Sequence, residues 1–196
     1  MPFGNGDRCF APNRRDLPCW GVARHMPAEK SKTDGMLVAQ LTDLAESAAR
    51  KLRERQETVA VAESSCGGLI SASLLSVPGA SAYFVGGTVT YTRVANRAFL
   101  AGDPVVLDGL QAETEDYALY LAHAVATTLE TTWGIGESGA AGPTGSRYGD
   151  PAGHVWVAVS GAADSTRHLL TGSVDRSANM VAFAAEALGL LIDCLG

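Results

Sequence analysis

The sequence is poor in cysteine and has no long apolar run. Its four cysteines, Cys9, Cys19, Cys66 and Cys194, form no C-x-x-C pair and do not cluster with the histidines. This spacing predicts reduced thiols and no zinc site. No apolar segment approaches the ~20 residues that span a bilayer, and the first residues lack the apolar core of a secretory signal. We therefore predict a cytoplasmic protein with no membrane partner, no metal and no other cofactor.

Positive charge is also scarce. The chain has 15 Lys and Arg residues against 21 Asp and Glu, a formal charge of -6 and an isoelectric point near 5.1. Nucleic-acid binding requires clustered Lys and Arg on one face, because each neutralised phosphate contributes to affinity. The composition predicts no nucleic-acid partner, although a small phosphate would still find local basic pockets.

What the chain does have suits one compact domain: 196 residues, 46% of them hydrophobic. Residues 1–35 are rich in Pro, Gly, Arg and Lys without a sustained period, which is typical of a flexible leader. Residues 36–196 form the predicted domain. It opens with a helical stripe of apolar residues at three- and four-residue spacing: Leu37, Leu41, Leu44, Ala45, Ala48 and Leu52.

Helices and apolar strands alternate through the domain. After the opening helix, periodicity and start signals predict helices over 68–75, 94–100, 114–131 and 176–194, and strands over 59–62, 81–91, 155–159 and 167–171. Gly86-Gly87 interrupts the second strand and predicts a bulge or a close backbone approach. This alternation predicts an α/β fold, a three-layer sandwich with helices on both faces of a mostly parallel or mixed sheet.

Two polar, glycine-rich segments are the candidates for a ligand site: a predicted turn over residues 63–68 and a predicted loop over residues 137–154. In open α/β sheets ligands bind beyond the carboxyl ends of the strands. A helix that begins near Gly67 would direct its unpaired N–H groups to an anion or a developing oxyanion. Ser64 or Ser65 would then be placed for chemistry. The commoner role of a serine here is to cap the helix, and the residues alone favour that role.

Familiar nucleophile motifs are missing from the first turn. A G-x-S-x-G elbow is excluded because Ala62 and Cys66 occupy its glycine positions, and no G-x-x-x-x-G-K-[ST] loop exists. Cys66 at a helix start could be a thiolate nucleophile. We favour a small half-buried apolar role for it, because no histidine stands in an obviously paired position.

Three ordered blocks resemble the CinA C-terminal domain family, the nicotinamide-nucleotide amidohydrolases. Residues 62–68, A-E-S-S-C-G-G, resemble the family's A-E-S-C-T-G-G. Residues 88–91, T-V-T-Y, resemble F-V-T-Y, and residues 138–143, S-G-A-A-G-P, resemble T-G-I-A-G-P. From Gly142 to Trp156 the family pattern aligns without a gap. The resemblance extends from about residue 36 to the C-terminus.

The resemblance implies an α/β/α domain that hydrolyses the carboxamide of nicotinamide mononucleotide to nicotinic acid mononucleotide and ammonia, in pyridine-nucleotide recycling. It implies no metal. The serine of A-E-S falls on Ser64, the implied nucleophile, and the tyrosine of V-T-Y falls on Tyr91. Tyr91 would orient or activate the serine; the alternative is a tyrosine that only packs. The helix start at Cys66, Gly67 and Gly68 would supply the oxyanion donors.

The second glycine-rich stretch would hold the nucleotide. Backbone and hydroxyl donors at Gly142, Thr144, Gly145 and Ser146 suit a phosphate. Arg147 would add charge, or would be a solvated loop arginine. Ser65 and Arg93 complete the predicted substrate contacts. A domain with so much small-residue surface is also expected to form a homo-oligomer, most simply a dimer.

The sequence departs from the family pattern at several cationic or polar positions. Asn96 stands where the family has lysine, Gly86 replaces an arginine, Asp150 replaces a lysine and Cys66 replaces a threonine. Arg93 restores some charge but cannot act as a base, because guanidinium keeps its proton. Two further interpretations therefore stay open: a catalytically silent nucleotide-binding or regulatory module, and a thiol hydrolase that uses Cys66.

Overall fold

The computed structural model describes residues 34–196, and the predicted leader lies outside them apart from its last two residues. Five strands form one mixed sheet in the order β2-β1-β3-β4-β5. They are β1 (Val59–Glu63), β2 (Phe84–Val89), β3 (Trp133–Ala140), β4 (His154–Ser160) and β5 (Ser165–Leu170). β1 pairs in parallel with β2 and β3, whereas β4 is antiparallel to β3 and β5.

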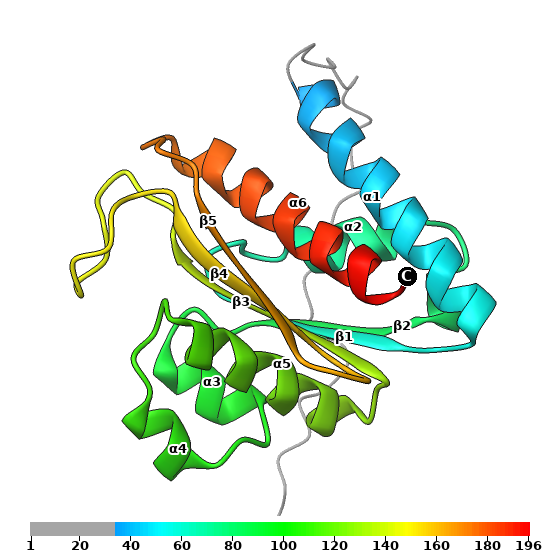
Figure 1. Ribbon diagram of the computed structural model, residues 1–196, viewed down its shortest axis with the longest axis horizontal. Helices are drawn as coiled ribbons and strands as arrows, with labels where there is room; N and C mark the ends of the chain where they lie inside the picture. The colour runs from blue at the N-terminus through cyan, green and yellow to red at the C-terminus, as the bar shows by residue number, and fades with distance from the viewer. Residues whose placement is uncertain (1–33) are drawn as a thin grey trace, which may run out of the picture. The chain divides into compact units, whose positions relative to one another are not determined.

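Helices cover both faces of this sheet, as the alternation of elements predicted (Figure 1). One layer contains α1 (Asp34–Arg55), α2 (Leu69–Ser76) and α6 (Arg176–Cys194). The other contains α3 (Arg93–Phe99), α4 (Pro104–Gly109) and α5 (Glu115–Leu129). A 3-10 turn, η1 (Ala80–Ala82), leads into β2. The predicted α/β three-layer sandwich is therefore confirmed.

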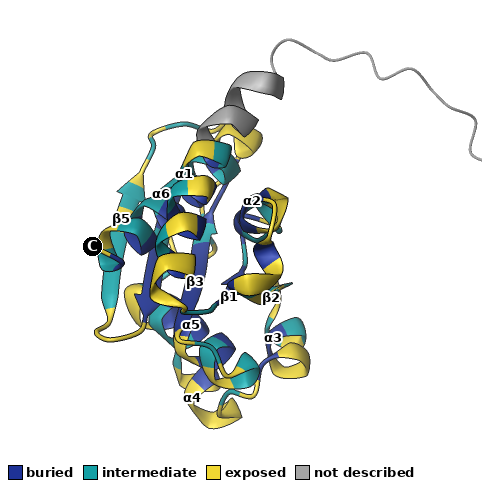
Figure 2. Ribbon diagram, turned by 90° about the vertical axis from the view of Figure 1, so that its right-hand side faces the viewer, coloured by how far each residue is buried: buried dark blue, intermediate teal, exposed yellow. Residues whose placement is uncertain are grey.

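The side chains of β1 contribute to an apolar core on each face of the sheet. Val59 and Val61 pack into the larger apolar cluster with α1, α2 and α6, whereas Ala60 and Ala62 face the cluster of α5. Every residue of β1 is buried, as expected for a central parallel strand covered on both faces. Figure 2 shows the buried strands between helices whose outer sides are exposed.

The prediction for residues 137–140 was wrong, because they belong to β3 and not to a loop. The glycines in the first half of β3 are required by packing. A Cβ on Gly134 or Gly136 would lie 2.1 or 2.0 Å from a backbone oxygen of α5. Glycine therefore lets α5 approach the middle strand closely.

The glycine pair of β2 has a similar role. The irregularity in β2 falls at Val85, since Val59 pairs with Phe84 and Ala60 pairs with Gly86. A Cβ on Gly87 would lie 2.1 Å from the hydroxyl oxygen of Ser71 in α2. The close approach was predicted correctly, but the bulge lies one residue earlier. The short helix α4 was not predicted at all.

By length and composition, α6 is the one helix among the described residues that could cross a membrane. In this fold it covers the sheet and contributes Phe183, Leu188 and Leu191 to the larger core. Its apolar face is therefore accounted for by packing within the domain.

Candidate functional site

The parallel strands β1, β2 and β3 end at one edge of the sheet, and a cleft opens there. The serine turn, Ser64–Cys66, follows β1. Tyr91 lies two residues after β2, and the Ala141–Gly142 segment follows β3. These segments line a cleft of about 500 Å³. This placement follows the rule that ligands bind at the carboxyl ends of strands in open α/β sheets.

A buried carboxylate from β3 holds the serine turn. The Glu137 side chain is fully buried. Its Oε2 accepts hydrogen bonds from the N–H groups of Ser64 and Cys66, both at 2.9 Å, and Ser65 Oγ donates to its Oε1. Burial raises the pKa of Glu137, and these donors counteract part of that rise. The turn is therefore fixed by three bonds to one side chain.

A second buried carboxylate, Glu63, caps α2. Its two oxygens accept from the N–H groups of Gly68, Ile70 and Ser71 at 2.9, 3.1 and 2.9 Å. The Ser71 hydroxyl also donates to Glu63, at 2.6 Å. Because a helix start leaves its first N–H groups without partners, Glu63 satisfies the donors that were expected to serve a ligand.

The structure therefore does not direct the predicted oxyanion donors at the cleft. The Gly68 N–H is bonded to Glu63 and the Cys66 N–H to Glu137. Gly67 lies beside α6, where an added Cβ would be 3.0 Å from Met180 Cε. None of the three lines the cleft. Burial also raises the pKa of the Cys66 thiol well above its ordinary value, which argues against a thiolate nucleophile.

The other predicted residues come together at the cleft. Ser64, Ser65, Tyr91, Arg93, Gly142, Thr144, Gly145, Ser146 and Arg147 all line it. The hydroxyl of Ser64 makes no hydrogen bond to any described residue, and it does not cap α2, whose N-cap is Gly68. Tyr91 is 61% exposed and forms no hydrogen bond with Ser64 in the described chain.

The candidate cations of the cleft differ in how they are held. Arg93 donates to the carbonyl oxygens of Leu107 and Leu110, at the end of α4 and just beyond it. Arg147 lies over the Tyr148 ring, 5.5 Å from its centroid. Asn96, at the position of the family lysine, is fully buried and does not line the cleft.

Sequence reasoning missed two charged residues of the cleft, Glu113 and Arg176. Arg176 begins α6, and its Nη1 donates to the Gly142 carbonyl oxygen at 2.8 Å. Glu113 precedes the N-cap of α5 and has φ +66°. Both residues lie at or just before the start of a helix, where a charged residue is common and does not by itself indicate a ligand site. No spacing in the sequence links either residue to the serine turn.

The fold and the cleft at the ends of β1–β3 define a class of α/β domain with a serine turn and a glycine-rich loop at one site. The model of the CinA C-terminal domain family matches residues 30–195. The chain belongs to this family.

Curated relatives agree. A CinA-like protein of Salinibacter ruber is 38% identical over 139 residues, which cover 70% of this chain and 33% of the relative. A CinA-like protein of Cyanothece sp. is 39% identical over 120 residues, 61% of this chain and 29% of the relative. The chain thus matches about a third of the length of these relatives.

Solved structures share the fold. The competence/damage inducible protein CihA from Agrobacterium tumefaciens has a TM-score of 0.73 and 28% identity, covering 79% of this chain and 94% of that chain. A CinA superfamily protein from Klebsiella pneumoniae has a TM-score of 0.74 and 28% identity, covering 79% of this chain and 97% of that chain.

Proposed function

We propose that this domain is a serine amidohydrolase that acts on the carboxamide of a pyridine nucleotide such as nicotinamide mononucleotide, releasing ammonia. The observation that carries the proposal is the serine turn. Ser64 follows β1 directly and lines the cleft. Glu137 holds it in place by accepting from the N–H groups of Ser64 and Cys66 and from the Ser65 hydroxyl. Membership of the CinA C-terminal domain family supports this assignment.

The proposed reaction uses the residues of the cleft as follows. Ser64 Oγ bonds to the carboxamide carbon, and its proton passes through Tyr91 to the leaving nitrogen, which departs as ammonia. Water then cleaves the serine ester, giving the carboxylate product and free Ser64. The N–H of Ser65 follows the nucleophile and has no hydrogen-bond partner in the described chain. It replaces Gly67 and Gly68 as the proposed oxyanion donor.

The remaining polar groups would bind the nucleotide. Arg147 and the donors of the Thr144–Ser146 loop face the same cleft as Ser64 and would hold the phosphate. Arg176 fixes the Gly142 carbonyl and would position this loop. We further propose that the protein acts in the cytoplasm, in the recycling of pyridine nucleotides.

A second candidate function, a silent nucleotide-binding module, is favoured by one observation. No lysine or histidine lines the cleft, and Asn96 is buried away from it. Tyr91, an unactivated phenol, would then be the group that accepts the proton of Ser64. In this case the protein would still bind the phosphate of the nucleotide but would not hydrolyse its amide.

The test is ammonia release from nicotinamide mononucleotide by the purified full chain, Ser64→Ala and a control, Ser81→Ala. Ser81 is an exposed serine of η1. We expect Ser64→Ala to lower kcat by roughly a thousandfold or more, while Ser81→Ala keeps wild-type turnover. Thermal shift with the same nucleotide reports binding independently.

Each outcome has a clear meaning. Turnover that survives in Ser64→Ala would refute the serine nucleophile. Wild-type protein that binds the nucleotide but releases no ammonia from it or from other amides would establish the binding module instead.

A further inference from the structure

Glu113 is the acidic residue among the side chains that line the cleft, where three arginines also lie. No arginine pairs with it in the described structure. Arg93 donates to the carbonyls of Leu107 and Leu110, and Arg176 donates to Gly142. A carboxylate and arginine side chains that do not pair with each other suit a ligand with a hydrogen-bond donor at one end and a negative charge at the other.

One oxygen of Glu113, Oε2, is buried and has no hydrogen-bond partner among the described residues. The nearby Ser146 hydroxyl has a single proton, which it donates to Asp150 Oδ2 at 2.8 Å. A buried acceptor without a partner is unfavourable for the empty protein. Burial raises the pKa of Glu113, and the neighbouring Asp150 adds to that rise while Ser146 opposes it.

The backbone of Glu113 is also held in an unfavourable conformation. Its φ of +66° lies in the left-handed region, which non-glycine residues rarely adopt. Two bonds hold it there. The Glu113 N–H donates to Ser138 Oγ at 3.1 Å, and its carbonyl oxygen accepts from His154 Nε2 at 2.9 Å. Such positions persist where the surroundings impose them, and they concentrate at functional sites.

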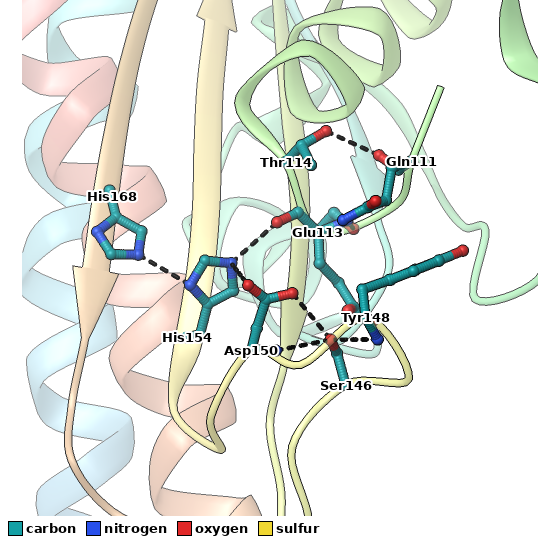
Figure 3. Close-up of polar contacts among 9 residues, drawn as sticks. Gln111, Glu113, Thr114, Ser146, Tyr148, Asp150, His154 and His168 are labelled. Atoms are coloured by element: carbon teal, nitrogen blue, oxygen red, sulfur yellow. Dashed lines mark hydrogen bonds and ion pairs between the residues drawn. The ribbon is translucent and has the colours of Figure 1, made fainter. Parts of the chain in front are cut away.

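A histidine pair supports this arrangement from the sheet (Figure 3). Because a carbonyl oxygen can only accept, His154 Nε2 carries the proton that is donated to Glu113. His154 Nδ1 is then the acceptor for His168 Nε2–H at 2.9 Å. His154 thus connects the backbone of Glu113 to His168 of β5.

We propose that Glu113 is a specificity-determining residue whose carboxylate accepts a hydrogen bond from an N–H or O–H group of the ligand, at the end away from its phosphate. Arg147 binds the opposite, anionic end. The proposal rests on the proposed function in that it places the nucleotide in the same cleft. Carboxamide nitrogen and ribose hydroxyl are the two sources of such a donor in a pyridine nucleotide.

The experiment compares wild-type protein with Glu113→Gln, Glu113→Gly and a control, Asp116→Asn. Asp116 is an exposed acid in the first turn of α5, so the control removes one negative charge outside the cleft. Calorimetry gives Kd for nicotinamide mononucleotide and for nicotinic acid mononucleotide, and a thermal melt gives Tm without ligand. The second nucleotide keeps the ribose but lacks the amide donor.

We expect both Glu113 variants to bind nicotinamide mononucleotide at least tenfold more weakly, with Tm unchanged or a few degrees higher, because the buried unpaired oxygen is removed or neutralised. Glu113→Gly also relieves the positive φ. Weakening for the amide nucleotide alone identifies the amide as the donor, and equal weakening for both identifies the ribose. Asp116→Asn keeps the wild-type Kd.

Three results would overturn the proposal. A fall in Tm of both variants with unchanged Kd would make Glu113 a structural residue. Unchanged Kd at higher Tm would remove it from the ligand contacts. Wild-type protein that binds neither nucleotide would refute both this proposal and the proposed function. Binding that depends on Glu113 without ammonia release upholds the proposal and refutes only the hydrolase.

Discussion

At the scale of single residues, two buried glutamates fix the serine turn and the helix that follows it. Glu63 holds the start of α2, and Glu137 holds Ser64, Ser65 and Cys66. Neither carboxylate lines the cleft. They act through the backbone, so the turn has a fixed shape before any ligand arrives, which is the preorganisation that covalent catalysis needs.

Replacement of Glu137 by glutamine tests this role. The amide keeps one acceptor but presents an NH₂ group toward buried donors, so at least one of the three bonds is lost. We expect the free energy of unfolding to fall by about 1–3 kcal/mol, measured by urea denaturation, and turnover to fall with it. Glu54→Gln, an exposed position on α1, should stay within about 0.5 kcal/mol of wild type. Equal stability of the two variants would contradict the structure.

His168 gives the protein a pH-dependent stability. Burial lowers the pKa of His168 below its ordinary value of 6.5, and a charge on His154 would lower it further. Below pH 6.5 the unfolded chain then binds more protons at this site than the folded chain. The stabilisation is complete above pH 6.5 and is lost as pH falls through the folded-state pKa.

We therefore expect wild-type protein to lose more stability than His168→Gln between pH 7 and pH 5 in denaturant titrations. Glu113 and Glu137 have raised pKa values and change stability in the opposite direction over part of this range. The comparison of the two proteins removes their contribution. Parallel pH profiles would show that His168 titrates normally.

At the scale of elements, the close contact between α5 and β3 is the most sensitive feature. A Cβ on Gly136 would lie 2.0 Å from the Ala118 carbonyl oxygen and 2.6 Å from the Ala122 nitrogen. Backbone cannot move aside as a side chain can. We expect Gly136→Ala to destabilise the domain by roughly 1–3 kcal/mol or more.

A matched glycine provides the control. Gly189 lies inside α6, where an added Cβ meets only Arg167 Nη1 at 3.8 Å. Gly189→Ala should stabilise the protein by about 0.5–1 kcal/mol, because alanine favours the helix. Thermal melts of both variants decide the point. A stable Gly136→Ala protein would show that α5 can shift.

The same glycines explain what the sequence could and could not predict. Amphipathic periodicity located α1, α5 and α6, and apolar runs located β1 and β4. The strand β3 was missed because glycine and serine have low strand propensity, and the close approach of α5 explains the presence of Gly134 and Gly136. The position of Ser64 at the cleft was predicted from local motifs. Glu113 and Glu137 were missed because their partners lie far away in the sequence, for example 71 residues between Cys66 and Glu137.

At the scale of the whole molecule, the domain matches nearly the full length of the Agrobacterium and Klebsiella structures but about a third of the curated relatives. The site is built within one domain, from the ends of β1, β2 and β3.

We propose that the chain forms a homodimer. Light scattering coupled to size exclusion should then give a mass near twice the 20.3 kDa of the chain. Apolar side chains exposed on the edge strand β2, Val85 and Val89, are consistent with association, because uncovered strand edges promote pairing. A mass equal to one chain at micromolar concentration would exclude the dimer.

The cap that Glu63 places on α2 also affects how the cleft would attract the proposed nucleotide. Many phosphate sites use the fixed partial charge of a helix start, which salt screens weakly at contact distance. Here that charge is already neutralised by a carboxylate of the same chain. Attraction must come from guanidinium groups at the solvent-exposed rim. Nucleotide capture should therefore weaken with increasing ionic strength, as the Debye length shortens from about 10 Å at 0.1 M toward about 3 Å at 1 M.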